Sequence, residues 1–135
     1  MTTTPEKNKA LVERFYNAMM RRDFDEILND IYARDARIWH NHDNREQTAE
    51  ENVGMLRAIG DIATLKVNYL ERIDHPRGCV QRNKIEFTLK NGKSFDIDNC
   101  LFFTIENGKF SYIIEYVDGV VVLNLSAALK EMGVG

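Results

Sequence analysis

The chain has 135 residues and a mass of 15.6 kDa, enough for one domain with one hydrophobic core and too little for two. Hydrophobic residues make up 44% and charged residues 29%, and the seven Phe, five Tyr and one Trp argue against a disordered chain. Lys and Arg total 18 against 21 Asp and Glu, so the net charge is −3. This balance provides no basic footprint, and we expect no nucleic-acid or membrane partner.

The N-terminal residues and the cysteines bear on the cellular location of the protein. The first eight residues are polar and lack the apolar core of a signal peptide, and no apolar run approaches the roughly 18 residues that span a bilayer. Cys79 and Cys100 lack the spacing of a zinc site and are too few for a disulfide framework. Nucleotide-binding, acyl-serine and zincin motifs are absent as well. We expect a cytoplasmic protein with reduced thiols, no metal and no cofactor.

The first third of the sequence predicts helices. From Pro5 to about Arg22 apolar residues recur at three- and four-residue spacing, with Thr4 placed as the helix cap. A short second helix is expected over residues 24–31, followed by an extended segment over 36–41. Thr48 and Glu51 have the spacing of a capping box and begin a third helix that ends at Gly60.

From residue 62 onward the apolar period changes to two. Strands are expected to about residue 70 and over 79–89, 94–105 and 110–117, followed by a short helix over 123–132. Asn91-Gly92 and Asn107-Gly108 each predict a two-residue hairpin turn with positive φ at both positions. Helices followed by an antiparallel meander indicate an α+β fold, and a strongly bent sheet would leave a cavity beneath it.

Three strings resemble the nuclear transport factor 2-like superfamily, especially its SnoaL-like and ketosteroid-isomerase-like members. They are FYNAMMRRDFD (residues 15–25), YARDARIW (32–39) and NGKFSYIIEYVD (107–118). The resemblance implies a single SnoaL-like domain over residues 1–135. Its fold would be a cone-shaped curved antiparallel sheet wrapped around N-terminal helices, the cystatin-like α+β barrel. It also implies a homodimer through the sheet, and it leaves function open because the superfamily contains enzymes, binding proteins and interaction modules.

Two branches of the superfamily suggest site residues. The resemblance to steroid isomerases carries their Asp base to His40, their oxyanion-binding Tyr to Phe15 beside Tyr16, and their second donor to Asn99 or Leu101. The resemblance to epoxide hydrolases carries a catalytic acid to Glu115 and an arginine to Arg82. It carries a second acid to Lys84, or to Glu86 with a slip in register, and the water-positioning pair to the neighbourhood of Trp39 and Asn41.

The pentad Trp39-His40-Asn41-His42-Asp43 is the most unusual local string. His40 has an ordinary pKa close to operating pH and suits a general base, Asn41 could orient a carbonyl or a water, and Trp39 could form an apolar wall. The alternative is a polar loop whose side chains satisfy turn hydrogen bonds. The two histidines lack a third ligand in sequence, which disfavours a metal site.

Glu115 is an acid within an otherwise apolar strand. It must face a cavity, where burial would make it a candidate acid or base, or face solvent beside a cation of the next strand. In the strand over 79–89, Arg82, Lys84, Glu86 and Thr88 alternate with Ile85, Phe87 and Leu89. Alternation alone leaves open whether the apolar row faces the core or a second copy of the chain.

We predict a cofactor-free general acid–base enzyme acting on a small hydrophobic metabolite, of the isomerase, cyclase or hydratase/epoxide-hydrolase type. The alternatives are a non-catalytic binder of a similar ligand and a dimeric interaction module. The predicted catalytic residues are His40, Glu115 and Arg82. The predicted substrate-binding residues are Tyr16, Trp39, Asn41, Asp43, Met55 and Asn99, of which Tyr16 and Met55 are equally typical of core packing.

Overall fold

Six strands form one curved, unclosed sheet in the computed structural model, which describes residues 2–133. In sheet order the strands are β2 (Arg45–Thr48), β1 (Tyr32–His40), β6 (Lys109–Val117), β5 (Ser94–Glu106), β4 (Gly78–Leu89) and β3 (Ala63–His75). The helices are α1 (Pro5–Met20), α2 (Phe24–Glu26), which runs into one π-helical turn, η1 (Ile27–Ile31), α3 (Ala49–Gly60) and α4 (Gly119–Glu131). The predicted α+β class with a curved sheet is therefore confirmed.

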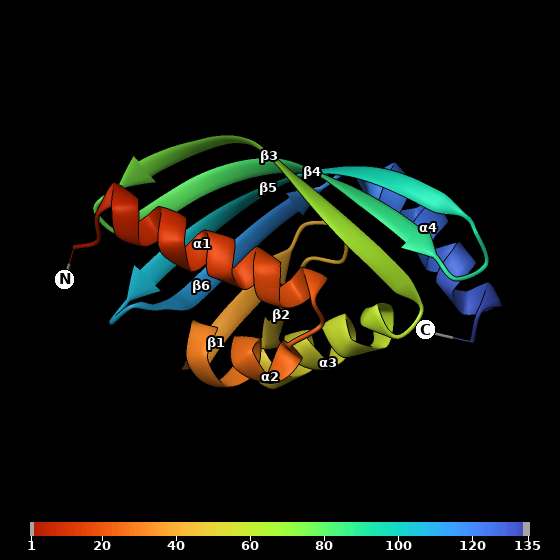
Figure 1. Ribbon diagram of the computed structural model, residues 1–135, viewed down its shortest axis with the longest axis horizontal. Coiled ribbons are helices and arrows are strands. Elements are labelled where there is room, and N and C mark those ends of the chain that lie inside the picture. The colour runs from red at the N-terminus through yellow and green to blue at the C-terminus, as the bar shows by residue number, and fades with distance from the viewer. Residues whose placement is uncertain (1, 134–135) are drawn as a thin grey trace.

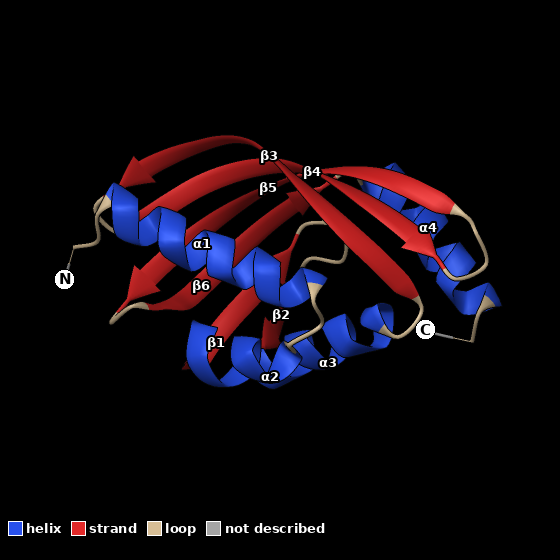
Figure 2. Cartoon of the chain, viewed as in Figure 1, coloured by secondary structure: helices blue, strands red, loops and turns tan. Residues whose placement is uncertain are grey.

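The sheet is mixed rather than wholly antiparallel, which corrects one part of the expectation. Four of its pairings are antiparallel, but β1 lies parallel to β6, with His40 beside Glu115. The long strands arch over α1, which crosses their inner face, while α2 and α3 lie near β1 (Figures 1 and 2). α4 lies at the end of the sheet farthest from the N-terminus (Figure 1). The parallel pair brings the chain segment after the first helices against the last strand.

Both predicted helix caps and one of the two predicted hairpin turns are confirmed. Thr4 Oγ1 accepts a hydrogen bond from the Lys7 amide, and Thr48 and Glu51 form both halves of the capping box. Asn107 and Gly108 have φ values of 52° and 75°, as a two-residue hairpin turn requires. The same prediction is wrong at Asn91-Gly92. There only Gly92 has positive φ, and the loop spans four residues, 90–93, between β4 and β5.

The histidine pentad is partly strand and partly turn. β1 continues to His40, a turn follows with Asn44 at φ 51°, and the chain returns as the short strand β2, which the sequence did not reveal. Its four residues are polar and at most half-buried, so it has none of the apolar alternation that marks a strand.

Two hydrophobic clusters fill the inner side of the sheet. The first joins α1 and η1 to the sheet and centres on residues with almost no exposed surface, including Ile27, Ile31, Phe103 and Phe110. The second packs Leu125 and Ala128 of α4 against Ile85 and Ile97. The apolar row Ile85, Phe87 and Leu89 thus faces inward, and its interpretation as a dimer interface is wrong. The charged row that includes Arg82 and Lys84 faces outward.

The cysteines are free thiols in the structure, Cys79 buried and Cys100 half-buried. Burial raises the pKa of the Cys79 thiol to about 12, so this thiol stays protonated at neutral pH. No helix within residues 2–133 is long and apolar enough to cross a membrane.

Thr48 offers a direct test of the capping interaction that begins α3. Thr48→Ala removes the oxygen that accepts from the Glu51 amide, and we expect it to lower the free energy of unfolding by about 1 kcal/mol. Thr48→Ser keeps a hydroxyl and should remain within a few tenths of a kcal/mol of the wild type. Urea unfolding monitored by circular dichroism measures both variants, and equal losses in the two would contradict the capping role.

Candidate active site

A cavity lies where the two hydrophobic clusters meet, between α1, α3 and the inner face of the sheet. Its inner chamber has a volume of about 120 Å³ and is lined mainly by apolar side chains. An adjoining groove of about 460 Å³ runs beneath α4. Chamber and groove share seven lining residues, including His40, Met55, Asn99 and Glu115. The polar groups therefore lie at the boundary between a small chamber and a larger apolar groove.

Glu115 is the central polar group of this cavity. It follows Ile113 on the inward phase of β6, and the sheet register places His40 of β1 and Leu101 of β5 beside it on opposite sides. One carboxylate oxygen, Oε1, lies 2.9 Å from His40 Nε2, and the other, Oε2, accepts from Asn99 Nδ2 at 2.8 Å. The Glu115 side chain is 18% exposed and that of His40 only 7%. The carboxylate is thus held from both sides while its surface toward the cavity stays open.

Glu115 governs the protonation of His40. Burial disfavours the charged imidazolium and acts to lower the pKa of His40. The hydrogen bond that His40 donates to Glu115, the negative charge of Glu115 and that of Asp43 together outweigh this effect. The pKa of His40 is therefore raised above its ordinary value of 6.5. His40 is therefore protonated to a larger extent than an unperturbed histidine at the same pH, with its proton beside the Glu115 carboxylate.

A chain of buried amides continues from Glu115 across the sheet. Asn99 Oδ1 accepts from Asn83 Nδ2 at 3.2 Å, and the same nitrogen donates to the Tyr16 hydroxyl oxygen at 3.0 Å. Gln81 Nε2 donates to Asn83 Oδ1 at 2.8 Å. Asn83 lies opposite Asn99 in the β4–β5 register, so strand pairing brings the two amides together. Every buried side-chain polar atom within residues 2–133 has a hydrogen-bond partner.

Two tyrosines complete the polar lining. Burial and the nearby charge of Glu115 raise the pKa values of both Tyr16 and Tyr32, so both phenols remain protonated donors. The Tyr32 hydroxyl donates a hydrogen bond to Asn52 Oδ1 at 2.6 Å, and Asn52 donates in turn to the Gln47 side-chain oxygen. The Tyr16 oxygen accepts from Asn83, which leaves its hydroxyl hydrogen available to the cavity.

Four of the nine residues predicted for the site do not line the cavity. Trp39 lies on the outer face of the sheet, with its ring 5.4 Å from Tyr116 and its indole N–H bonded to Asn44. Neighbouring residues of a strand face opposite sides of the sheet. Because His40 faces inward, the adjacent Trp39 faces outward. Arg82 is also on the outer face, exposed and paired with Glu71 at 2.9 Å.

Asn41 and Asp43 have local structural contacts instead. The Asn41 amide accepts from the Val117 backbone N–H at 2.9 Å and donates to its carbonyl at 3.2 Å, which fastens the end of β1 to β6. Asp43 accepts from the Arg45 amide within the turn. The polar-loop interpretation therefore describes these two residues, while His40, Glu115, Asn99, Tyr16 and Met55 do meet at the cavity.

Sequence reasoning missed Gln81, Asn83 and Asn52. Gln81 and Asn83 share the inward phase of β4 with Ile85, and polar residues continuing an apolar row were the available signal. Asn52 faces inward from α3 in the turn before Met55, with no pattern that separates it from an exposed helical Asn.

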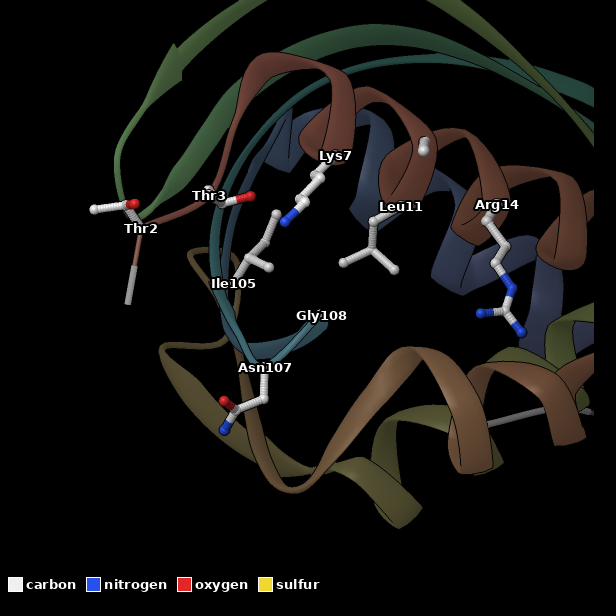
Figure 3. A pocket seen from close by; sticks show the side chains of 9 residues that line it. Thr2, Thr3, Lys7, Leu11, Arg14, Ile105, Asn107 and Gly108 are labelled. Atoms are coloured by element: carbon white, nitrogen blue, oxygen red, sulfur yellow. The ribbon is translucent and has the colours of Figure 1, made fainter.

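A second open groove, of about 360 Å³, lies between the start of α1 and the β5–β6 turn (Figure 3). Lys7 and Arg14 lie on one side and Asn107 on the other (Figure 3), but Arg14 is already paired with Glu26. No acid lines this groove, so it holds no acid–base pair comparable to that of His40 and Glu115. Residues 2–133 contain no group of three or more side chains that could hold a metal ion.

A family profile described as the SnoaL-like domain matches residues 12–113, most of the chain and every strand from β1 to β5. The chain belongs to the SnoaL-like family. A search of curated proteins finds no match. Among solved structures, PrhC from Penicillium brasilianum is similar with a TM-score of 0.82 and 14% identity, over 97% of this chain and 93% of that one.

Two further solved structures resemble this SnoaL-like protein. One is assigned to the SnoaL-like polyketide cyclases and comes from Shewanella putrefaciens, with a TM-score of 0.75, 15% identity, and coverage of 93% of this chain and 99% of that one. The other is an LEH-like epoxide hydrolase from M. tuberculosis, with a TM-score of 0.73, 15% identity, and coverage of 93% and 97%. At these identities the likeness establishes a common fold, and function must be argued from the site.

The coupling between His40 and Glu115 can be measured directly. In Glu115→Gln the imidazole stays buried but loses the carboxylate, so we expect the pKa of His40 to fall below its ordinary value. An NMR titration of the ring nitrogens measures it. Asp43→Asn is the matched control, which should lower the pKa less because Asp43 contributes less than Glu115. An unchanged pKa in Glu115→Gln would contradict the pairing.

The raised pKa also fixes a pH dependence of stability. A histidine whose pKa is higher in the folded than in the unfolded state stabilises fully below its unfolded pKa, about 6.5. That contribution is lost as the pH rises through the folded pKa. The difference in unfolding free energy between the wild type and Glu115→Gln should therefore become smaller as the pH rises over this interval. Urea unfolding at a series of pH values measures this difference.

Proposed function

We propose that this SnoaL-like protein is a cofactor-free enzyme that transfers protons on a small hydrophobic molecule carrying a carbonyl group. The pairing of Glu115 with His40 at the boundary between chamber and groove is the observation that carries this proposal. A carboxylate in an apolar cavity can act as a general base, and the histidine 2.9 Å away can hold a proton beside it.

The proposed reaction begins with removal of a proton from the carbon next to the carbonyl. The C–H electron pair moves into an enolate, the proton goes to Glu115, and the oxygen receives a hydrogen bond from the Tyr16 hydroxyl. His40, as the imidazolium, balances the carboxylate charge beforehand, and the abstracted proton stays on Glu115 until it is returned. Return of the proton to another carbon completes an isomerisation. Attack of the enolate carbon on a second carbonyl, whose oxygen then takes the proton, completes a cyclisation.

The apolar walls support a hydrophobic substrate. A chamber of about 120 Å³ admits only a small group, and the groove of about 460 Å³ beneath α4 provides the size usual for a small-molecule site. We infer that the reacting end enters the chamber while the rest of the molecule lies along α4. The position of Arg82 on the outer face disfavours the epoxide-hydrolase arrangement, which needs that arginine beside its acids.

Hydrogen–deuterium exchange tests the proton transfer without knowledge of the natural substrate. We expect the wild type to accelerate exchange at the α-carbon of 2-tetralone in D₂O, followed by NMR. Glu115→Gln should reduce the enzymatic rate at least about 100-fold, because it removes the base. Arg82→Gln, on the outer face, should exchange at the wild-type rate.

The alternative functions predict different results. A non-catalytic binder would bind 2-tetralone, detected by shifts of cavity resonances, yet give the same exchange in wild type and Glu115→Gln. An interaction module would neither bind nor exchange the ketone. Either outcome would refute the catalytic proposal.

We further propose a homodimer formed through the outer face of the sheet. Support comes from an exposed aromatic cluster of Trp39, Phe102 and Tyr116, with Phe102 43% and Tyr116 48% exposed and their rings 6.2 Å apart. Side chains of both signs border it on the same face, including the ion pair of Lys84 with Asp98. Such a surface can face a second copy of itself without net repulsion.

Sedimentation velocity tests the proposed dimer. Phe102→Ser removes one exposed aromatic ring and should shift the wild-type dimer toward monomer by at least about tenfold in dissociation constant. Leu123→Ser, which changes an even more exposed apolar residue on α4, is the control and should leave the dimer unchanged. A monomeric wild type would refute this interface.

A further inference from the structure

Three amide side chains are buried on the inner face of the sheet. Asn83 has no exposed surface, Gln81 is 4% exposed and Asn99 is 5% exposed. Burying an amide among apolar groups is costly unless all its polar atoms are bonded, and a leucine at either β4 position would avoid the cost. Asn83 and Gln81 are therefore positions where the stability of the sheet alone does not favour the residue present.

Both hydrogens and the oxygen of the Asn83 amide form hydrogen bonds, and these bonds allow only one orientation of the amide. Its Nδ2 has two hydrogens, one donated to the Tyr16 oxygen and one to Asn99 Oδ1. Its Oδ1 accepts from Gln81 Nε2. Turning the Asn83 amide over would bring its oxygen against Asn99 Oδ1 and its nitrogen against a donating nitrogen of Gln81. Gln81 thus fixes which end of Asn83 faces the cavity groups.

The orientation of the Asn83 amide determines how the side chains of Tyr16 and Asn99 are oriented at the cavity. Because the Tyr16 oxygen accepts from Asn83, the Tyr16 hydrogen must point elsewhere, and the cavity is where a carbonyl oxygen would meet it. Because Asn99 Oδ1 is occupied, Asn99 turns its Nδ2 toward Glu115 Oε2. One asparagine therefore determines that Tyr16 donates to the substrate and that Asn99 donates to the base.

We propose that Asn83, oriented by Gln81, is a positioning residue that fixes the donor direction of Tyr16 and Asn99 around the reacting group. It touches neither the substrate nor the transferred proton and acts through these two side chains. The inference rests on the proposed function of Glu115 as the base, but the orientation of the amides is itself a property of the resting protein.

Asn83→Asp reverses the polarity at nearly constant volume. The new carboxylate can only accept, so it draws the Tyr16 hydrogen away from the cavity and draws the Asn99 amide nitrogen away from Glu115. We expect enzymatic exchange of 2-tetralone to fall at least about tenfold in kcat with little change in KM, because the oxyanion donor is lost. The pKa of His40, measured by NMR, should rise further, since Glu115 loses a competing donor and a negative charge is added.

Gln81→Leu separates orientation from charge. It adds no charge and leaves Asn83 free to turn over, so kcat and the pKa of His40 should change in the same directions as in Asn83→Asp, by smaller amounts. Asn8→Ala is the matched structural control. Asn8 is equally buried, but it bonds Asp74 and the Gly78 carbonyl away from the cavity. This variant should lower the unfolding midpoint while kcat and the His40 pKa stay at wild-type values.

Each outcome decides whether Asn83 positions the cavity groups or only stabilises the fold. If Gln81→Leu and Asn83→Asp remain folded with wild-type kcat and His40 pKa, or if Asn8→Ala alters both as they do, the positioning role is refuted. If the wild type shows no exchange at all, the proposed function fails. The His40 pKa in Gln81→Leu and Asn83→Asp then still tests the amide orientation, because that measurement needs no substrate.

Discussion

The buried carboxylate of Glu115 is the constraint that organises the site. A carboxylate in an apolar cavity is tolerated only when hydrogen bonds and an opposite charge replace the water it has lost. Its partners come from the strands on either side, His40 from β1 and Asn99 from β5. Glu115 therefore requires β6 to lie between β1 and β5, and the parallel β1–β6 pairing is what supplies the histidine.

The same constraint explains the division of the interior into two hydrophobic clusters. The cluster under α1 and the cluster under α4 are nearly all apolar, and the row from His40 to Gln81 lies along the sheet where they meet. Polar groups there are satisfied by one another across strands. α4, capped by Asp118 directly after β6, covers the groove side with apolar residues, so the polar row faces a cavity bounded by hydrocarbon.

How far the sequence predicts this arrangement depends on the range of each interaction. Thr48 with Glu51, and Asn107 with Gly108, act within four residues, so their patterns predicted a helix start and a turn correctly. Glu115 and His40 were also identifiable, because an acid in an apolar strand and a histidine ending an extended segment stand out locally. Trp39 was misplaced because the alternation of the extended segment over 36–41 was not applied to the pentad. When His40 faces inward, the adjacent Trp39 must face outward.

The sequence could indicate that the amides of β4 face inward, but it could not identify their hydrogen-bond partners, because these depend on the register of the strands. Asn83 is one polar residue among many until pairing places it opposite Asn99 and α1 places Tyr16 above it. Only then does each of its hydrogens have one acceptor, and only then does the donor from Gln81 remove the remaining freedom of the amide. The side chains that we propose contact a substrate are thus the detectable part of the site, while the amides that we propose orient them are identified only in the assembled sheet. A polar residue on the inward phase of an otherwise apolar strand is the signal worth following in related sequences of this fold.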